Sequence, residues 1–405
     1  MADGALTASP PAGRRLPAAL RIAIVYLAAR ALTTVFLLVA AELSGPASRF
    51  GADATIGSLS MGWDAQWYWL VGTGGYPSEL PRGDTGAVAE NAWAFMPLYP
   101  FLARTVGLVL TYPVAAVLIS LVAGYLACLA LHALLRDRLD ERAAMWAVVL
   151  LAAGPLAAVF QMGYAESLFL LWLLLALRAL QRRRFGRLYL LIPLMGYTRP
   201  GVLAFALLLA LYGLARWVRR RSDVLPARHV VHILALGILA AVVGFSWQVV
   251  AGLVTGEPGA YLETELSWRR SWTGDAGAPF LPFDGFVQAS ALWFRLWGMP
   301  EWWAWIALAA CVLAAAGALH FAPQVRRLGP EIRLWSVAYL VYLLAVFFPQ
   351  SSLFRLLLPL APLYGALAAP PSRAWRFSVL ALGLLGQWWW IYNMLALGNT
   401  YYQIP

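Results

Sequence analysis

The chain is 405 residues long, and 62% of its residues are hydrophobic while only 12% are charged. Soluble domains average about 45–50% apolar and about 25% charged residues, so the composition excludes an ordinary soluble protein. At about 20 residues per helical crossing, the apolar runs predict an all-α polytopic membrane protein with about ten or eleven transmembrane helices. The net charge of +11 does not indicate a nucleic-acid partner, because the arginines are distributed over short loops and do not gather on one face.

The N-terminal segment is typical of a cytoplasmic tail followed by a membrane anchor. Arg14, Arg15 and Arg21 precede the apolar run from about 22 to 42, and basic residues favour the cytoplasmic side. A cleaved signal peptide is the alternative, because small residues follow the apolar core of this run. The run is too long for a typical signal core, and Arg30 interrupts it. We therefore expect a retained anchor with its N-terminus in the cytoplasm.

Loop charge organises the remainder of the chain. We expect residues 1–20 to form the tail and residues 21–405 to form one transmembrane domain in the lipid bilayer. Arginine-rich loops recur along the chain and are assigned to the cytoplasm by the positive-inside rule. Two loops, at about 43–112 and about 254–300, hold most of the acidic residues and are assigned to the outside. Connections of this length usually carry function.

One segment does not fit a simple alternation of full-length helices. Arg187 and Arg216 both look cytoplasmic, yet too few residues separate them for two complete spans. Two short helices that meet near Tyr197–Pro200 would fit, provided that the irregular backbone is buried in protein or lines a polar cavity. The alternative is one long tilted helix, which would place the later arginine-rich loops outside.

The first external loop contains the motif Trp63-Asp64-Ala65-Gln66-Trp67-Tyr68. Aromatic rings can exclude water from a carboxylate and raise its affinity for a proton, which makes Asp64 a candidate general base. The alternative is that the rings form an interfacial belt and that Asp64 only caps a helix. Both interpretations are compatible with the sequence.

A second acidic candidate, Glu166, lies at the outer bend of a predicted helical hairpin over about 143–180, within Tyr164-Ala165-Glu166-Ser167. An ionisable group at the edge of an apolar helix is a functional candidate, although it can also stabilise the helix N-terminus. The turn Phe95–Pro100 precedes an apolar helix and is interpreted as a rigid interfacial turn.

Two arginines are expected on the same outer face. Arg199 lies in Thr198-Arg199-Pro200-Gly201, which opens a helix, and Arg355 follows the polar turn Pro349–Ser352. A guanidinium and free backbone N–H groups at a helix start suit a phosphate. Alternatively, Arg199 snorkels to the surface or pairs with Glu166.

Neither a metal nor a cofactor is predicted. Cys128 and Cys311 both fall inside apolar runs and form no disulfide or metal pattern.

Taken in order, these motifs resemble the PIG-V-type mannosyltransferases of the GT-C superfamily and their bacterial relatives. The resemblance covers most of the chain and rests on Trp63–Tyr68, Phe95–Pro100, Tyr164–Phe169 and Thr198–Pro200. It implies a GT-C-like helical bundle with a long first extracytoplasmic loop. It also implies an enzyme that moves a sugar, usually mannose, from a polyprenyl-phosphate donor to an extracytoplasmic glycolipid or glycan acceptor.

The resemblance assigns Asp64 to the position of the catalytic acid in the first loop. With inversion at the sugar carbon, Asp64 would take the acceptor proton while Arg199 and Arg355 bind the donor phosphate. Substrate-binding residues are then expected to be Trp63, Gln66, Trp67, Tyr68, Tyr164 and Glu166. A transporter or flippase of lipid-linked sugars is the alternative, because broken helices and arginines around a polar cavity would serve it equally well.

Overall fold

The computed structural model describes residues 16–274, 279–398 and 405. The predicted tail therefore lies largely outside the described residues, as do residues 275–278 of the second external loop. The described residues are nearly all helical, and their only extended pairing is a bridge between Arg82 and Val88. This confirms the all-α class expected from the composition.

Four of the described helices are long and apolar enough to cross a membrane singly: α1 (Ala18–Glu42), α5 (Tyr112–Leu135), α10 (Ala227–Thr255) and α13 (Glu301–Phe321). The other apolar segments form shorter pieces: α6 (Glu141–Ala152), η2 (Ala157–Gln161), α7 (Glu166–Gln181), α8 (Phe185–Gly196), α9 (Val202–Val218), α15 (Pro330–Val346), η3 (Leu358–Leu363), α17 (Tyr364–Ala368) and α18 (Arg373–Trp390). The protein is thus a polytopic helical membrane protein, while the count of ten or eleven crossings stays a prediction.

Helix α7 forms the centre of the bundle and packs closely against α5. Most of its side chains are buried, as expected for a helix that is apolar on every side. Helix α5 carries small buried residues, including Ala116, Ala123 and Gly124. A Cβ on Gly124 would lie 2.5 Å from the Tyr26 hydroxyl of α1 and 2.8 Å from the Phe160 ring of η2, so the close approach of these two elements to α5 requires glycine. Small residues of this kind let membrane helices approach each other.

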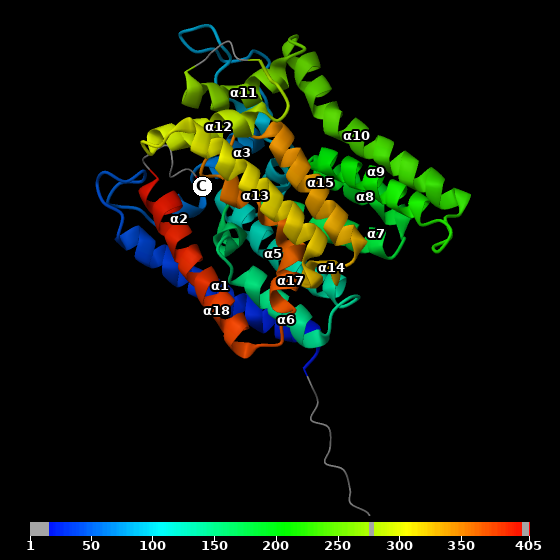
Figure 1. The fold of residues 1–405 in the computed structure, drawn as a ribbon. Helices are drawn as coiled ribbons and strands as arrows, with labels where there is room; N and C mark the ends of the chain where they lie inside the picture. Colours follow the sequence, from blue (N-terminus) through cyan, green and yellow to red (C-terminus); the bar gives the residue numbers. More distant parts are fainter. Residues whose placement is uncertain (1–15, 275–278, 399–404) are drawn as a thin grey trace, which may run out of the picture.

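Short helices gather at one end of the bundle, the upper end in Figure 1. They come from the two long loops: α2 (Ile56–Ser60), α3 (Asp64–Gly74), η1 (Ala92–Ala94), α4 (Leu98–Val106), α11 (Ala260–Thr273) and α12 (Asp284–Leu296). Asn91 Nδ2 donates to Thr264 Oγ1 at 2.8 Å, so the two long loops contact each other. This end is the one that the sequence assigns to the outside.

Arginine–carboxylate pairs gather at the opposite end. Arg182 pairs with Asp137 at 2.6 Å, and Arg183 pairs with Asp223 at 2.7 Å. Asp223 also contacts Arg216, at 3.0 Å. These pairs link the loops that the sequence assigns to the cytoplasm, and that assignment stays a prediction.

The segment between Arg187 and Arg216 is broken into two helices. Helix α8 ends at Gly196, the chain then turns, and α9 begins at Val202 after Gly201, which has φ +138°. A φ in this range is readily adopted only by glycine. The structure agrees with the two short helices expected from the spacing of the arginines.

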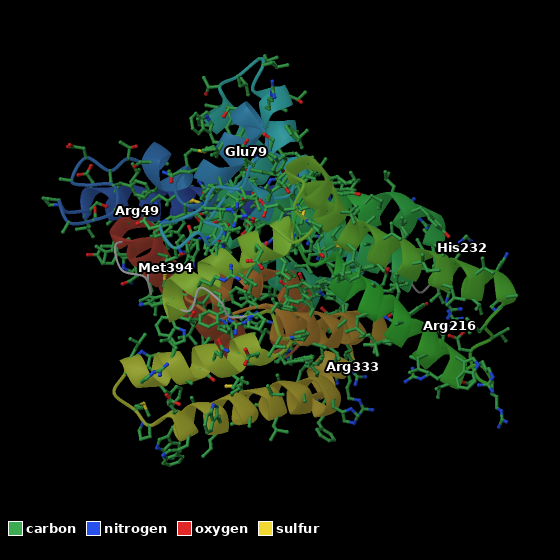
Figure 2. The ribbon with its side chains drawn as sticks, turned by 90° about the horizontal axis from the view of Figure 1, so that it is seen from above. Arg49, Glu79, Arg216, His232, Arg333 and Met394 are labelled. Carbon is green, nitrogen blue, oxygen red and sulfur yellow. The ribbon has the colours of Figure 1, made fainter. Side chains whose placement is uncertain are left out.

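The C-terminal part closes the bundle against its first helix. Gln387 of α18 donates to Thr33 of α1 at 2.8 Å, and the following η4 (Ile391–Leu397) accepts from the Arg49 backbone through Leu397. Figure 2 shows Arg49 beside Met394 of η4, with the α12–α13 hairpin at one edge of the molecule. Two short helices, α14 (Pro323–Arg326) and α16 (Leu353–Leu356), complete the chain.

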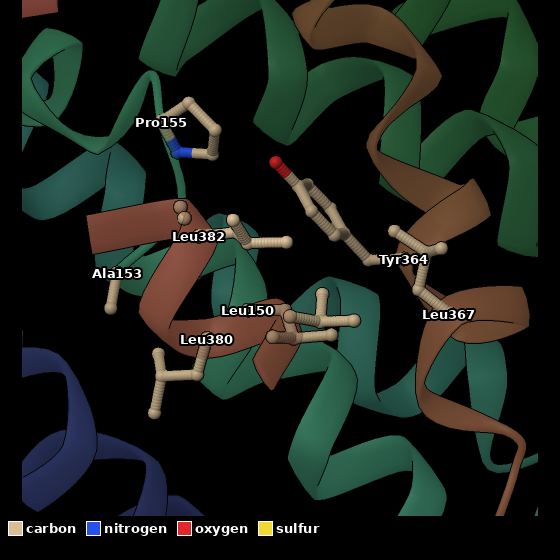
Figure 3. Close-up of a pocket in the computed structure, with 10 residues that line it drawn as sticks. Leu150, Ala153, Pro155, Tyr364, Leu367, Leu380 and Leu382 are labelled. Atoms are coloured by element: carbon tan, nitrogen blue, oxygen red, sulfur yellow. The ribbon is translucent and has the colours of Figure 1, made fainter. Parts of the chain in front are cut away.

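A cavity of about 290 Å³ lies between α6, α17 and α18. Its walls are mainly apolar, with Leu150, Pro155, Leu380 and Leu382 around the Tyr364 ring (Figure 3). None of the four charged residues singled out in the sequence lines it.

Candidate active site

Four charged side chains from distant parts of the sequence meet below the short helices. Arg355 Nη1 donates to Asp64 Oδ2 at 2.6 Å and lies 3.0 Å from Glu166 Oε1. Arg199 pairs with the same oxygen of Glu166. The four residues that the sequence singled out as a candidate base, an acid and two phosphate-binding arginines are therefore brought together in one cluster.

The cluster has a buried part and an accessible part. The side chains of Glu166 and Arg355 are only 3% and 6% exposed. Those of Asp64 and Arg199 are 27% and 13% exposed. Two carboxylates offset two guanidiniums, which keeps the buried part close to neutral, and removing one partner of such a pair typically costs about 3–5 kcal/mol. The accessible part faces the end at which the two long loops meet.

Asp64 is the first residue of α3, and an unusual backbone conformation precedes it. Trp63 has φ +54°, which a side chain other than glycine rarely adopts. The guanidinium of Arg49 lies 3.9 Å from the Trp63 ring centroid and holds the ring in place. The Asp64 side chain does not cap α3; it points to Arg355. Its Oδ1 atom makes no hydrogen bond with the described residues and is free to accept a proton.

Glu166 and Arg199 owe their positions to helix starts. Glu166 begins α7, where the positive end of the helix dipole favours a carboxylate. Arg199 lies in the turn between α8 and α9, and Thr198 Oγ1 fixes this turn by donating to the Leu194 carbonyl at 2.6 Å. The alternative that Arg199 pairs with Glu166 is thus realised, while Arg199 still faces the accessible side of the cluster.

Arg355 lies on α16, directly after the polar turn that the sequence indicated. Its guanidinium carbon is 5.0 Å from the Tyr164 ring centroid, a distance at which a cation and a ring attract each other. Tyr164 is fully buried, and its hydroxyl has no hydrogen-bond partner among the described residues. The buried Tyr164 ring therefore packs against the guanidinium of Arg355 and helps to hold it in place.

Aromatic rings form one wall beside the cluster. Trp67 stacks on Phe95 with centroids 5.7 Å apart, and Trp268 of α11 contacts both rings at 6.1 Å. Tyr68 is buried against Phe95 and Tyr99, at 5.2 and 5.1 Å. The Phe95–Pro100 turn is thus part of this wall as well as a rigid connection.

The remaining residues assigned to substrate binding lie at different distances from the cluster. Gln66 is exposed on α3, and Trp63 packs against Arg49. Trp67 and Trp268 are half-buried and can contact a bound molecule. A substrate-binding role stays a prediction for all six residues: Trp63, Gln66, Trp67, Tyr68, Tyr164 and Glu166.

Glu265 is a neighbour of the cluster that the sequence interpretation did not single out. It is exposed on α11, yet the surrounding protein removes enough water to raise its pKa to about 7. Arg199 lowers this pKa and Asp64 raises it, so both charges lie within electrostatic reach. The signal in the sequence is the spacing Tyr261, Glu265, Trp268, which places three polar or aromatic groups on one helix face.

The arrangement can perform proton transfer beside anion binding. Asp64 offers a partly exposed carboxylate, and Arg199 and Arg355 offer guanidinium groups within the same cluster. A hydroxyl group and a phosphate could therefore be held next to each other, with the proton and the negative charge going to opposite partners.

Comparison with known proteins yields no family. The sequence matches no family model and no curated protein. Similar solved structures include three of an archaeal oligosaccharyltransferase from Archaeoglobus fulgidus. The first, in complex with Zn and sulfate, is 16% identical and gives a TM-score of 0.43, with 91% of this chain and 53% of that chain covered.

The other two are structures of Archaeoglobus fulgidus oligosaccharyltransferase in different complexes. The form tethered to an acceptor peptide is 13% identical, with a TM-score of 0.37 and coverage of 93% and 55%. The AglB complex with an inhibitory peptide and a dolichol-phosphate is 15% identical, with a TM-score of 0.39 and coverage of 93% and 56%. The chain spans little more than half the length of these proteins, and a likeness of this degree assigns no substrate.

Proposed function

We propose that this protein is a membrane glycosyltransferase that moves a sugar from a polyprenyl-phosphate donor to an acceptor hydroxyl outside the cytoplasm. Mannose is the sugar favoured by the resemblance of the motifs. The observation that carries the proposal is the cluster itself, in which Arg355 binds one oxygen of Asp64 while the Asp64 side chain stays 27% exposed.

The chemistry follows from this arrangement. The acceptor oxygen attacks the anomeric carbon of the sugar from the side opposite the phosphate, and its proton passes to Oδ1 of Asp64. The bond between the anomeric carbon and the phosphate oxygen breaks, and the polyprenyl phosphate departs with additional negative charge. Arg199 and Arg355 stabilise that charge through charge-assisted hydrogen bonds. A single displacement of this kind inverts the configuration of the sugar carbon.

The test is sugar transfer by purified protein in liposomes that contain polyprenyl-phosphate mannose and a membrane-lipid extract. We expect Asp64→Asn to reduce the rate by about 10²–10⁴-fold, the usual contribution of a general base, with donor binding retained. Asp53→Asn is the matched control, because Asp53 is an exposed carboxylate in the same loop, and it is expected to leave the rate unchanged.

Two results would contradict the proposal. Equal rates for Asp64→Asn and wild type would remove the general-base role. Movement of the donor across the bilayer without any transfer would favour a transporter of lipid-linked sugars.

A further inference from the structure

Helix α11 contacts the aromatic wall beside the cluster through Trp268 and carries one accessible carboxylate, Glu265. The helix has 14 residues and a polar composition, so it is not a membrane span. Thr264 and Leu266 are buried, whereas Glu265 between them is exposed. The buried side of α11 is fixed to the first external loop by the Asn91–Thr264 hydrogen bond of 2.8 Å. Glu265 therefore has a defined position at the edge of the site.

The ring contacts place Glu265 opposite Asp64. Trp67 follows Asp64 by one turn on α3, and Trp268 follows Glu265 by one turn on α11, so each acid shares a helix face with its ring. The Trp67 and Trp268 centroids are 6.1 Å apart. Two carboxylates from two helices thus lie on either side of an accessible aromatic wall.

The charged and titratable groups around Glu265 come from every neighbouring element. The Tyr261 hydroxyl donates a hydrogen bond to it from the same helix, and Tyr342 of α15 lies within electrostatic reach. Arg199 acts on it from the α8–α9 turn, and Asp64 acts on it from α3. Glu265 forms no ion pair with the described residues, in contrast to Asp64 and Glu166.

We propose that Glu265 binds a hydroxyl of the acceptor, and that the acceptor presents a sugar ring to Trp67 and Trp268. This inference deepens the proposed function and rests on it. The carboxylate accepts a hydrogen bond from a ring hydroxyl, while the apolar face of the sugar packs on the indoles. The site therefore selects a carbohydrate acceptor, either a glycolipid head group or a soluble glycan.

The charges assign this subsite to the acceptor. An unpaired carboxylate repels the phosphate of the donor, which belongs with Arg199 and Arg355. An uncharged polyhydroxylated acceptor is not repelled and gains a charge-assisted hydrogen bond. The acceptor hydroxyl that reacts then lies between the free oxygen of Asp64 and the carboxylate of Glu265.

Binding should depend on pH with a definite sign. The ionised carboxylate is the better hydrogen-bond acceptor, and the pKa of Glu265 is about 7. Acceptor affinity is therefore expected to rise as the pH increases through about 7 and to fall below it. In Glu265→Gln this dependence should disappear, and in Glu265→Ala the affinity should fall by about 10-fold or more.

The experiment measures equilibrium binding of radiolabelled octyl mannoside to full-length protein in nanodiscs, between pH 5.5 and 8.5, with steady-state transfer recorded in parallel. The variants are Glu265→Gln, Glu265→Ala and the control Glu263→Gln. Glu263 lies on the same helix but pairs with Arg270 at 2.7 Å, so its variant should bind and transfer like wild type. Methyl mannoside competes in the same assay and separates recognition of the sugar from recognition of the alkyl chain.

The outcomes separate the two proposals. Binding that depends on Glu265 supports the subsite whether or not transfer occurs, and absence of transfer with every donor contradicts only the proposed function. A higher KM for the acceptor with an unchanged kcat in Glu265→Ala supports both the subsite and the proposed function. Binding that is equal in wild type and Glu265→Ala, with the same pH profile, would overturn the subsite, as would the absence of saturable binding to wild type.

Discussion

At the scale of single residues, Glu166 holds the charge balance of the site. One of its oxygens contacts both Arg199 and Arg355, so this carboxylate is the link between the two guanidiniums. Asp64 adds a second contact for Arg355 but none for Arg199. The balance therefore depends more on Glu166 than on any other member of the cluster.

Replacing Glu166 by Gln is expected to destabilise the protein strongly. Arg199 would lose its only ion pair with the described residues, and the buried Arg355 would keep only Asp64. The cluster would then hold an uncompensated positive charge, which costs about 3–5 kcal/mol. Thermal unfolding followed by tryptophan fluorescence should show a lower midpoint than wild type. The double variant Glu166→Gln/Arg199→Met should recover part of the loss, because the uncompensated charge is removed.

An exposed ion pair provides the comparison. Asp137 accepts hydrogen bonds from Arg182 at 2.6 and 2.8 Å, with geometry as good as that of the cluster but at the surface. Asp137→Asn should change stability by no more than about 1 kcal/mol. If the two single variants unfolded at the same temperature, burial would not be the source of the cost.

The sequence identified which residues belong to the cluster, but it did not predict that Arg355 forms ion pairs with Asp64 and Glu166. Asp64, Glu166, Arg199 and Arg355 each lie beside a turn or helix start on the same expected face, which is why local patterns identified them. The pairing of Asp64 with Arg355 spans 291 positions, and no local pattern encodes it. Glu265 was missed because it is one of several acids in a long polar loop and looks like an ordinary solvated charge.

At the scale of elements, the break between α8 and α9 determines where Arg199 lies. Helix α8 ends at Gly196 and α9 begins at Val202, so the intervening turn reaches the cluster. The break was predictable because too few residues separate the two arginine-rich ends for two complete spans, and the alternative of one long tilted helix conflicts with the positive-inside rule. Its conformation was not, because it depends on the positive φ of Gly201.

Substitution of Gly201 by Ala should displace this turn. A Cβ at Gly201 would lie 3.3 Å from the Phe169 ring, and φ +138° is unfavourable for alanine, at a cost of about 1–3 kcal/mol. We expect a lower unfolding midpoint and, if the proposed function is correct, slower transfer with weaker donor binding.

The control for this substitution is Gly237→Ala in α10. Gly237 has open space around its Cβ position, and alanine favours a helix interior over glycine by about 1 kcal/mol. This variant should be as stable as wild type or more stable. A similar fall of the unfolding midpoint in both variants would mean that the positive φ of Gly201 is not the cause of the destabilisation.

At the scale of the whole molecule, the two ends of the bundle are chemically distinct. The short helices and the cluster occupy one end, and the pairs of Arg182, Arg183 and Arg216 occupy the other. Composition predicted the helical class, whereas the orientation expected from loop charge stays a prediction. The number of crossings also stays a prediction, because apolar runs interrupted by Pro and Gly fold into broken helices that a count of hydrophobic stretches treats as single spans.

Orientation in the membrane is a testable consequence of this polarity. In a background with Cys128→Ala and Cys311→Ala, Gly83→Cys in the first long loop should react with an impermeant maleimide in intact cells. Ser222→Cys, beside the Asp223 pairs, should react only after the membrane is opened. The reverse pattern would place the charged cluster on the cytoplasmic side.

The contacts of Arg355 have a consequence for biosynthesis. As the chain leaves the ribosome, Asp64 and Glu166 enter the membrane before either arginine exists. Arg199 follows and can neutralise Glu166, but Asp64 has no cation until Arg355, 291 positions further along the chain, has been made. A nascent chain that stops before Arg355 therefore holds an incomplete site. Synthesis of α16, which carries Arg355, completes the cluster.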